Sequence, residues 1–176
     1  PEDEAILLPY FNEEAPEDFA LVLAPHEIHE EHLRAIESGL KRPSIRLSEY
    51  DEAKGLPEGT ACIIIDCFGL LSSVYRYGTW AYVGGGFGKS VHNTLEAAVY
   101  GIPVFFGPEI HKHREVRELV RRSSGFILHD RAELSQLLQR FSSEEECKAL
   151  EARTRAYFSE ECGATAAILG DILPSE

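Results

Sequence analysis

The sequence WAYVGGGFGKSVHNTLEAAVYGIPVFFGP, at residues 80–108, decides the fold. It opens with an aromatic and β-branched run, residues 80–83, which is typical of a strand. Three glycines follow directly and a fourth stands at Gly88, so this loop carries few Cβ atoms and a ligand can approach its backbone closely. Four glycines in five positions exceed what a turn requires. We therefore interpret the segment as a ligand-binding loop, with a flexible turn as the alternative.

A helix and a second strand are expected after the glycine loop. Asn93 is a natural N-cap, and Glu96 three residues later completes a capping box, so we predict a helix over residues 94–100. Gly101 ends this helix, and the apolar run 102–106 predicts a strand that is buried on both faces. Free N–H groups at a helix start attract anions, so the whole unit predicts an anion-binding site.

Two familiar phosphate-binding loops do not fit the spacing. A Walker loop that ends at Lys89 and Ser90 needs its first glycine where Val83 stands. A dinucleotide-binding fingerprint that starts at Gly84 needs a small residue where Lys89 stands, and no acidic ribose ligand follows at the usual distance. The sequence therefore argues against a P-loop NTPase and against a dehydrogenase.

The rest of the chain alternates between strands and helices. Apolar runs predict further strands at 19–24, 44–47, 61–66 and 125–128, and periodic apolar positions predict helices at 28–39, 70–77, 111–122, 130–140, 143–158 and 163–173, after a first helix near the amino terminus. This alternation favours the α/β class with a doubly wound, Rossmann-like parallel sheet, in a single domain over residues 1–176. Ligands bind such sheets beyond the carboxyl ends of the strands, so the loops after 19–24, 61–66 and 80–83 are expected to form one composite pocket.

Composition excludes several classes of function. The formal charge of −13 argues against a nucleic-acid partner, because neutralising phosphates requires a basic surface. There is no apolar run of 18 residues and no signal-like segment, so we expect no membrane span. The chain contains no Met, and we expect it to be part of a longer protein. The four cysteines lack C-x-x-C spacing, which predicts free thiols in a reducing cytosol; they are Cys62, Cys67, Cys147 and Cys162.

Three segments resemble the Kdo transferases, which move 3-deoxy-D-manno-octulosonic acid (Kdo) from CMP-Kdo to the lipid A precursor, lipid IVA, in lipopolysaccharide biosynthesis. The segments are APHEIHE at 24–30, DCFGLLSSVYRYGTWAYVGGG at 66–86 and, most specific, HNTLEAAVYGIPVFFGP at 92–108. The resemblance covers only the carboxyl-terminal half of such enzymes. It implies the second domain of a GT-B glycosyltransferase that performs inverting transfer on the cytoplasmic face of the inner membrane. The acceptor domain and membrane anchor would lie outside this chain, which is itself expected to be soluble.

The resemblance also implies a donor-binding site. Pro25 and His26 would line the CMP site, and the nucleotide would lie along Phe68, Gly69 and Leu70. Ribose and phosphate would be bound by Asn93, Thr94, Leu95 and Glu96. From the residues themselves, the glycine loop adds Gly85, Gly86 and Ser90 as expected ligand contacts. His26 stands where many members have Arg, and Leu70 where they have Glu. The family's catalytic base is a glutamate of the amino-terminal domain, so we expect no catalytic residue, no metal and no cofactor in this chain.

Several of these residues also have purely structural interpretations. Glu96 can cap its helix without a ligand, and Lys89 can simply be solvated. His26, His29 and His32 do not form an H-E-x-x-H motif, so we interpret them as a polar helix start rather than a metal site. Asp66 is either catalytic or a cap. A solvated helix face is the simplest interpretation of Lys112, Arg114, Arg117, Arg121 and Arg122, with an anionic sugar or acceptor phosphate as the alternative.

Two other functions share the predicted architecture. A GT-B enzyme that uses a UDP-sugar, such as a hexosaminyl transferase or an epimerase, would have the same sheet and loops. A non-catalytic nucleotide-binding domain is the alternative from a different class.

Overall fold

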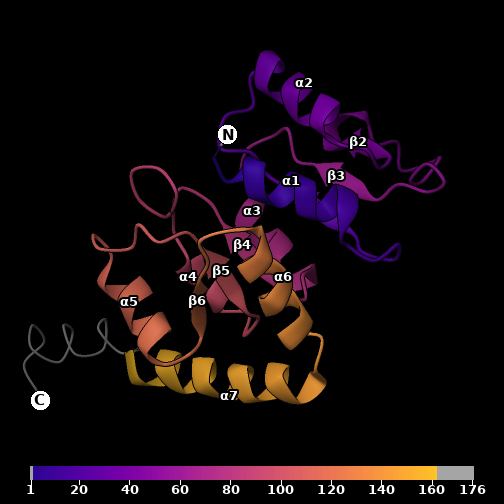
Figure 1. Ribbon diagram of the computed structural model, residues 1–176. Helices are drawn as coiled ribbons and strands as arrows, with labels where there is room; N and C mark the ends of the chain where they lie inside the picture. Colours follow the sequence, from indigo (N-terminus) through magenta and orange to yellow (C-terminus); the bar gives the residue numbers. More distant parts are fainter. Residues whose placement is uncertain (1, 162–176) are drawn as a thin grey trace, which may run out of the picture. The chain divides into compact units, whose positions relative to one another are not determined.

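The computed structural model describes residues 2–161 (Figure 1), and the predicted helix at 163–173 and Cys162 lie outside this range. The helices are α1 Glu4–Glu13, α2 Glu30–Gly39, α3 Leu71–Val74, α4 Leu95–Ala98, α5 Arg114–Arg121, α6 Arg131–Arg140 and α7 Glu144–Glu161. The strands are β1 Leu21–Leu23, β2 Ser44–Arg46, β3 Cys62–Ile64, β4 Ala81–Val83, β5 Val104–Phe106 and β6 Gly125–Ile127. Two 3₁₀ helices, η1 Leu47–Glu49 and η2 Tyr75–Tyr77, complete the described elements. All six predicted strands are therefore present.

The chain divides into two compact units, each with its own sheet. Unit 1 holds the described residues up to Val74 together with His129–Gln136, and unit 2 holds Tyr75–Leu128 and the described residues from Leu137 onward. The strand order is β1-β3-β2 in unit 1 and β4-β5-β6 in unit 2. Every strand pair is parallel, which confirms the predicted parallel α/β class, with the six strands paired in two sets of three. The single-domain organisation over 1–176 stays a prediction.

In unit 1, two helices pack on one face of the sheet. Phe11 of α1 and Ile36 of α2 join a buried cluster with the inward-facing residues of β1 and β3. Arg46 of β2 bonds the carboxylates of Glu30 and Glu37 on α2, each at 2.7 Å, and so fixes that helix to the sheet edge. On the other face Val22 is 46% exposed. The continuous apolar run at 19–24 is typical of a strand covered on both faces, and for β1 this expectation was wrong.

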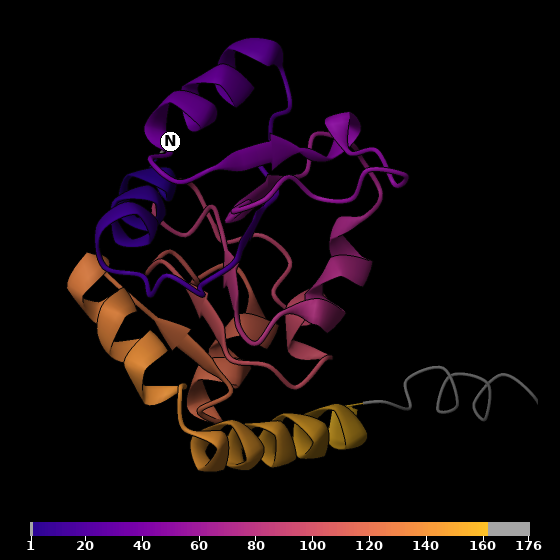
Figure 2. The same ribbon diagram turned by 90° about the vertical axis from the view of Figure 1, so that its right-hand side faces the viewer.

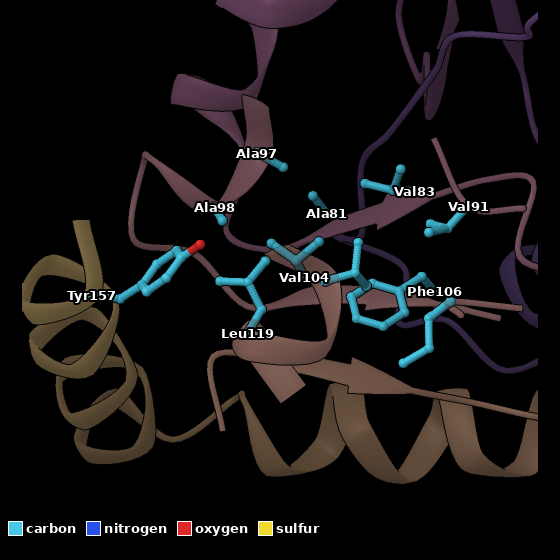
Figure 3. Packing of buried hydrophobic residues seen from close by; sticks show 11 residues of the cluster. Ala81, Val83, Val91, Ala97, Ala98, Val104, Phe106, Leu119 and Tyr157 are labelled. Carbon is cyan, nitrogen blue, oxygen red and sulfur yellow. The ribbon is translucent and has the colours of Figure 1, made fainter. Parts of the chain in front are cut away.

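In unit 2, the central strand β5 is buried on both faces, as predicted. Val104 and Phe106 belong to a cluster that Figure 3 shows, in which Tyr157 of α7 points toward α4 and α5. Phe105 faces the other way and contacts the rings of Trp80, Phe126 and Phe141. Figures 1 and 2 both show α7 as one long helix running along this unit. Aromatic side chains therefore pack on both faces of β5, and this strand leads into the loop that begins at Gly107.

Several helices begin later than the sequence predicts, because local caps decide the boundary. The α2 helix starts at Glu30, since the His29 side chain accepts a hydrogen bond from the His32 N–H. The α7 capping box is half formed: Ser143 Oγ accepts from the Glu146 N–H at 3.4 Å, while the Glu146 carboxylate pairs with Arg140 at 2.7 Å. No helix in residues 2–161 combines the length and apolar character needed to cross a membrane.

The described cysteines are free thiols, as predicted. Cys62 is buried in β3, Cys67 is exposed and Cys147 is half-buried. Burial raises the pKa of the Cys62 thiol to about 12, which keeps it protonated and unreactive at neutral pH.

Candidate functional site

The glycine loop after β4 closes on itself through backbone hydrogen bonds. The His92 N–H donates to the Gly84 carbonyl at 3.0 Å, and the Gly88 N–H donates to the Gly85 carbonyl at the same distance. The loop therefore leaves the strand, makes a tight turn and returns to its starting point before α4 begins.

Internal packing accounts for two glycines of this loop. Gly85 has a φ of +90°, and a Cβ there would collide with the carbonyl oxygen of Ser90. A Cβ on Gly86 would lie 2.6 Å from the backbone nitrogen of Gly107, in the loop after β5. Both positions need glycine because protein backbone, rather than a ligand, approaches them. At these two positions glycine therefore gives no argument for ligand approach, and their contact with a ligand stays a prediction.

The same contact joins the glycine loop to the loop after β5. The Glu109 N–H donates to the Gly86 carbonyl at 2.9 Å, and the Val91 N–H donates to the Glu109 carbonyl at 3.1 Å. Because β4 and β5 are parallel neighbours, both loops leave the sheet at its carboxyl edge. Sequence reasoning missed this pairing. Its signal was the Gly107-Pro108 turn directly after the buried strand.

Asn93 and Glu96 meet at the start of α4, which is a single turn rather than the predicted 94–100. The Leu95 N–H donates to Asn93 Oδ1 at 3.1 Å, and Asn93 Nδ2 donates to Glu96 Oε1 at 2.9 Å. These two partners fix the orientation of the amide, because an N–H requires the oxygen and a carboxylate requires the NH₂ group. Thr94 is the N-cap residue by backbone position, yet its side chain makes no capping bond. Asn93 provides the predicted cap from one residue earlier.

This arrangement leaves hydrogen-bonding capacity at an exposed position. Asn93 is exposed and Glu96 is half-buried. Within residues 2–161, Glu96 Oε2 makes no hydrogen bond, so one carboxylate oxygen remains for an external donor.

Burial, with a smaller contribution from the Glu96 charge, raises the pKa of Tyr75 to about 12. The Tyr75 hydroxyl therefore stays protonated at neutral pH.

Two predicted ligand contacts are less accessible. Thr94 is 0% exposed, and its hydroxyl has no hydrogen-bond partner among the described residues. The hydroxyl of Ser90 is likewise buried and unpaired, while Leu95 is half-buried. A ligand can reach Thr94 only if the loop opens.

The predicted site residues of unit 1 follow β1 and β3. Pro25 is half-buried and His26 is exposed. Phe68 is 82% exposed and Leu70 is 38% exposed, while Gly69 has a φ of +90° with open space around it. These residues belong to one unit and the glycine loop to the other, so the composite pocket stays a prediction.

Asp66 has a structural role. Its carboxylate accepts from the Ser48 N–H at 3.0 Å and from Ser48 Oγ at 2.5 Å, which caps η1 rather than the turn that follows Asp66. Burial acts to raise the pKa of Asp66, but these hydrogen bonds outweigh it and hold the pKa below its ordinary value.

Glu27, His29 and His32 bring potential metal ligands together, with ligand atoms within 4.8 Å of one another. Hydrogen bonds engage all four ring nitrogens. His29 Nδ1 accepts from the His32 N–H and Nε2 contacts Glu27, while His32 contacts the Glu27 carbonyl at 2.8 Å and Glu4 at 2.7 Å. The predicted polar helix start is therefore confirmed for His29 and His32. His26 does not belong to the cluster of Glu27, His29 and His32. The absence of a metal stays a prediction.

Comparison with known proteins first defines a class. The C-terminal CMP-Kdo binding domain of WaaA from Acinetobacter baumannii has the same fold, with a TM-score of 0.72 and 21% identity over 87% of this chain and 79% of that domain. The two parallel sheets and their loops therefore have the architecture of the carboxyl-terminal domain of a GT-B glycosyltransferase. No protein-family model matches the chain.

Sequence relatives then define the family. The chain is 32% identical over 134 residues to 3-deoxy-D-manno-octulosonic acid transferase of Aquifex aeolicus, covering 74% of the chain and 36% of that protein. The transferase of Rickettsia typhi is 29% identical over 72% of the chain, and that of Chlamydia muridarum 30% over 65%. The chain belongs to the Kdo transferase family and corresponds to its C-terminal domain. It spans about a third of the length of the curated relatives it matches.

Proposed function

We propose that this chain is the donor-binding part of a Kdo transferase and that it holds CMP-Kdo for transfer of Kdo to a lipid A precursor. The observation that carries the proposal is the 32% identity to the Aquifex aeolicus transferase over most of the chain. The shared fold with a CMP-Kdo binding domain supports it. A UDP-sugar enzyme has no comparable support.

The start of α4 would bind ribose and phosphate. Glu96 Oε2 would accept from a ribose hydroxyl while Oε1 keeps its bond from Asn93. The positive end of the helix and nearby loop N–H groups would stabilise the charge that develops on the departing CMP phosphate. In unit 1, Pro25, His26 and the exposed 68–70 segment would contact the nucleotide.

The rest of the reaction would be performed by other parts of the whole protein. An amino-terminal domain would supply the catalytic base, bind lipid IVA and attach the enzyme to the cytoplasmic face of the inner membrane. We therefore expect no sugar transfer by residues 1–176 alone, and turnover by this piece would contradict the division of roles.

Calorimetric titration with CMP, UMP and UDP tests the donor assignment. We expect CMP to bind more tightly than either uridine nucleotide, and a preference for uridine would favour a UDP-sugar enzyme. Asn93→Ala and Glu96→Ala should each weaken CMP binding about tenfold, as loss of a hydrogen bond involving a charged group does. Glu58→Ala is a control, because this exposed residue lies outside the site. Unchanged CMP binding in both site variants would leave Asn93 and Glu96 as helix caps.

A further inference from the structure

Four cationic side chains have no partner among residues 2–161. All 17 lysines and arginines lie within residues 2–161, and most of them donate to carboxylates or carbonyl oxygens there. The side chains that make no hydrogen bond, ion pair or ring contact in that range are Arg76, Lys89, Lys112 and Arg114. A chain with a formal charge of −13 offers many internal anions, so unpaired cations indicate a surface suited to an external anion.

Of these four cations of unit 2, two lie on adjoining loops and a third lies at the first residue of α5. Lys89 belongs to the glycine loop after β4, and Lys112 and Arg114 follow β5. All three are exposed. The hydrogen bonds of Glu109 to the glycine loop hold the two loops together, and Lys112 is only three residues beyond that anchor. At about 3.5 Å per residue, the Lys112 Cα lies within roughly 11 Å of the Glu109 Cα.

Two acidic residues stand close to Lys112 and Arg114 in the sequence, Glu109 and Glu115. Glu109 is the only acidic residue in the segment 107–113. Glu115, in the first turn of α5, is engaged by His113 at 3.2 Å. The N-cap residue of α5 makes no side-chain hydrogen bond to the first turn, so it leaves the N–H groups at the start of α5 uncapped.

We infer that Lys112 and Arg114 bind the carboxylate of the donor sugar, an inference that rests on the proposed function. Kdo is an octulosonic acid, and its carboxylate is attached to the anomeric carbon, the same carbon that carries the CMP phosphate. A phosphate held between the glycine loop and α4 therefore places the carboxylate close to the phosphate and near the adjoining loop. The planar guanidinium of Arg114 matches a carboxylate in a two-point hydrogen bond, with Lys112 as a second charge. UDP-hexoses lack this carboxylate, so the pair selects an acidic sugar.

Binding of CMP and of freshly prepared CMP-Kdo, measured by microscale thermophoresis, tests the inference. The double variant Lys112→Gln/Arg114→Gln should weaken CMP-Kdo binding about tenfold or more and change CMP binding less than about twofold, because CMP lacks the carboxylate. Arg76→Gln is the matched control, since Arg76 is also exposed and unpaired but lies before β4, and it should leave both affinities unchanged.

Four outcomes would overturn the inference. If the double variant binds CMP-Kdo as the wild type does while CMP still binds, the carboxylate contact is wrong and the proposed function stands. If Arg76→Gln weakens CMP-Kdo binding equally, the loss of affinity reflects the overall charge of the chain and not a specific contact of Lys112 and Arg114. If the double variant binds CMP-Kdo as before but no longer binds phosphatidylglycerol vesicles, Lys112 and Arg114 contact a membrane surface instead. A wild-type chain that binds neither nucleotide removes the proposed function and the inference together.

Discussion

The loop after β3 in unit 1 and the loop after β4 in unit 2 carry the same backbone feature in opposite surroundings. Gly69 and Gly85 both have a φ of +90°. A Cβ on Gly69 would meet nothing within 4 Å, and the neighbouring Phe68 is 82% exposed. A Cβ on Gly85 would meet the backbone of its own loop, and Gly86 beside it is pressed against Gly107. Glycine thus marks an open turn in one loop and dense backbone packing in the other.

The difference suggests two kinds of contribution to ligand binding. The loop after β4 is fixed by its own hydrogen bonds, so donors at the start of α4 can be positioned before a ligand arrives. The loop after β3 has its polar anchor at Asp66, whereas Phe68 and Leu70 remain accessible. Fixed polar groups suit phosphate and ribose, and an exposed aromatic ring suits a base.

Glycine replacement should give the largest separation between the two loops. Gly86→Ala forces a Cβ to within 2.6 Å of the Gly107 nitrogen, and we expect it to lower the free energy of unfolding by about 3 kcal/mol. In Gly69→Ala the new Cβ contacts no other atom, so only the positive φ lowers the free energy of unfolding, by about 1 kcal/mol. Urea denaturation of both variants measures the two values. Equal losses would mean that the glycine loop is not packed as described.

A smaller effect is expected at the polar anchor of the open loop. Asp66 has a folded-state pKa below its ordinary value of 3.8, so the bonds from Ser48 stabilise the fold above that pH and are lost as the pH falls through the lower, folded-state pKa. Asp66→Asn should cost less than about 1 kcal/mol at pH 7 and flatten the stability curve below about pH 4. Thermal unfolding from pH 2 to 7 tests this. A variant curve parallel to that of the wild type would show that Asp66 does not contribute to acid unfolding.

The smallest change in stability is expected for the exposed ring. Phe68→Ser removes a side chain that is 82% exposed, so the free energy of unfolding should change by less than about 0.5 kcal/mol. If the cytosine base stacks on this ring, CMP affinity should still fall about tenfold. Tyr50→Ser, at another exposed aromatic of unit 1, is the control and should not affect affinity. Equal CMP binding by both variants would remove Phe68 from the site.

Sequence patterns predicted the features that depend on residues close together in the chain. The strand 102–106, the capping role of Asn93 and the alternation of strands and helices follow from apolar runs and hydrogen-bonding side chains close in the chain. The contact of Gly86 with Gly107 was missed, because the two are 21 positions apart. The Gly107-Pro108 turn shows that a loop follows the strand, but nothing local shows which backbone that loop meets. Asp66 bonding to Ser48 was missed for the same reason. The glycine loop and the helix start indicated an anion site from the residues themselves, whereas the assignment of individual residues to ribose, phosphate and base came from the resemblance.

The central claim is that the glycine loop and the start of α4 hold the CMP phosphate and ribose. Backbone amide spectra of the ¹⁵N-labelled chain, recorded during titration with CMP, test it most directly. The account predicts the largest shift changes in the segment 84–96, with saturation at a single dissociation constant. Saturable changes confined to other parts of the chain, with 84–96 unaffected, would contradict it.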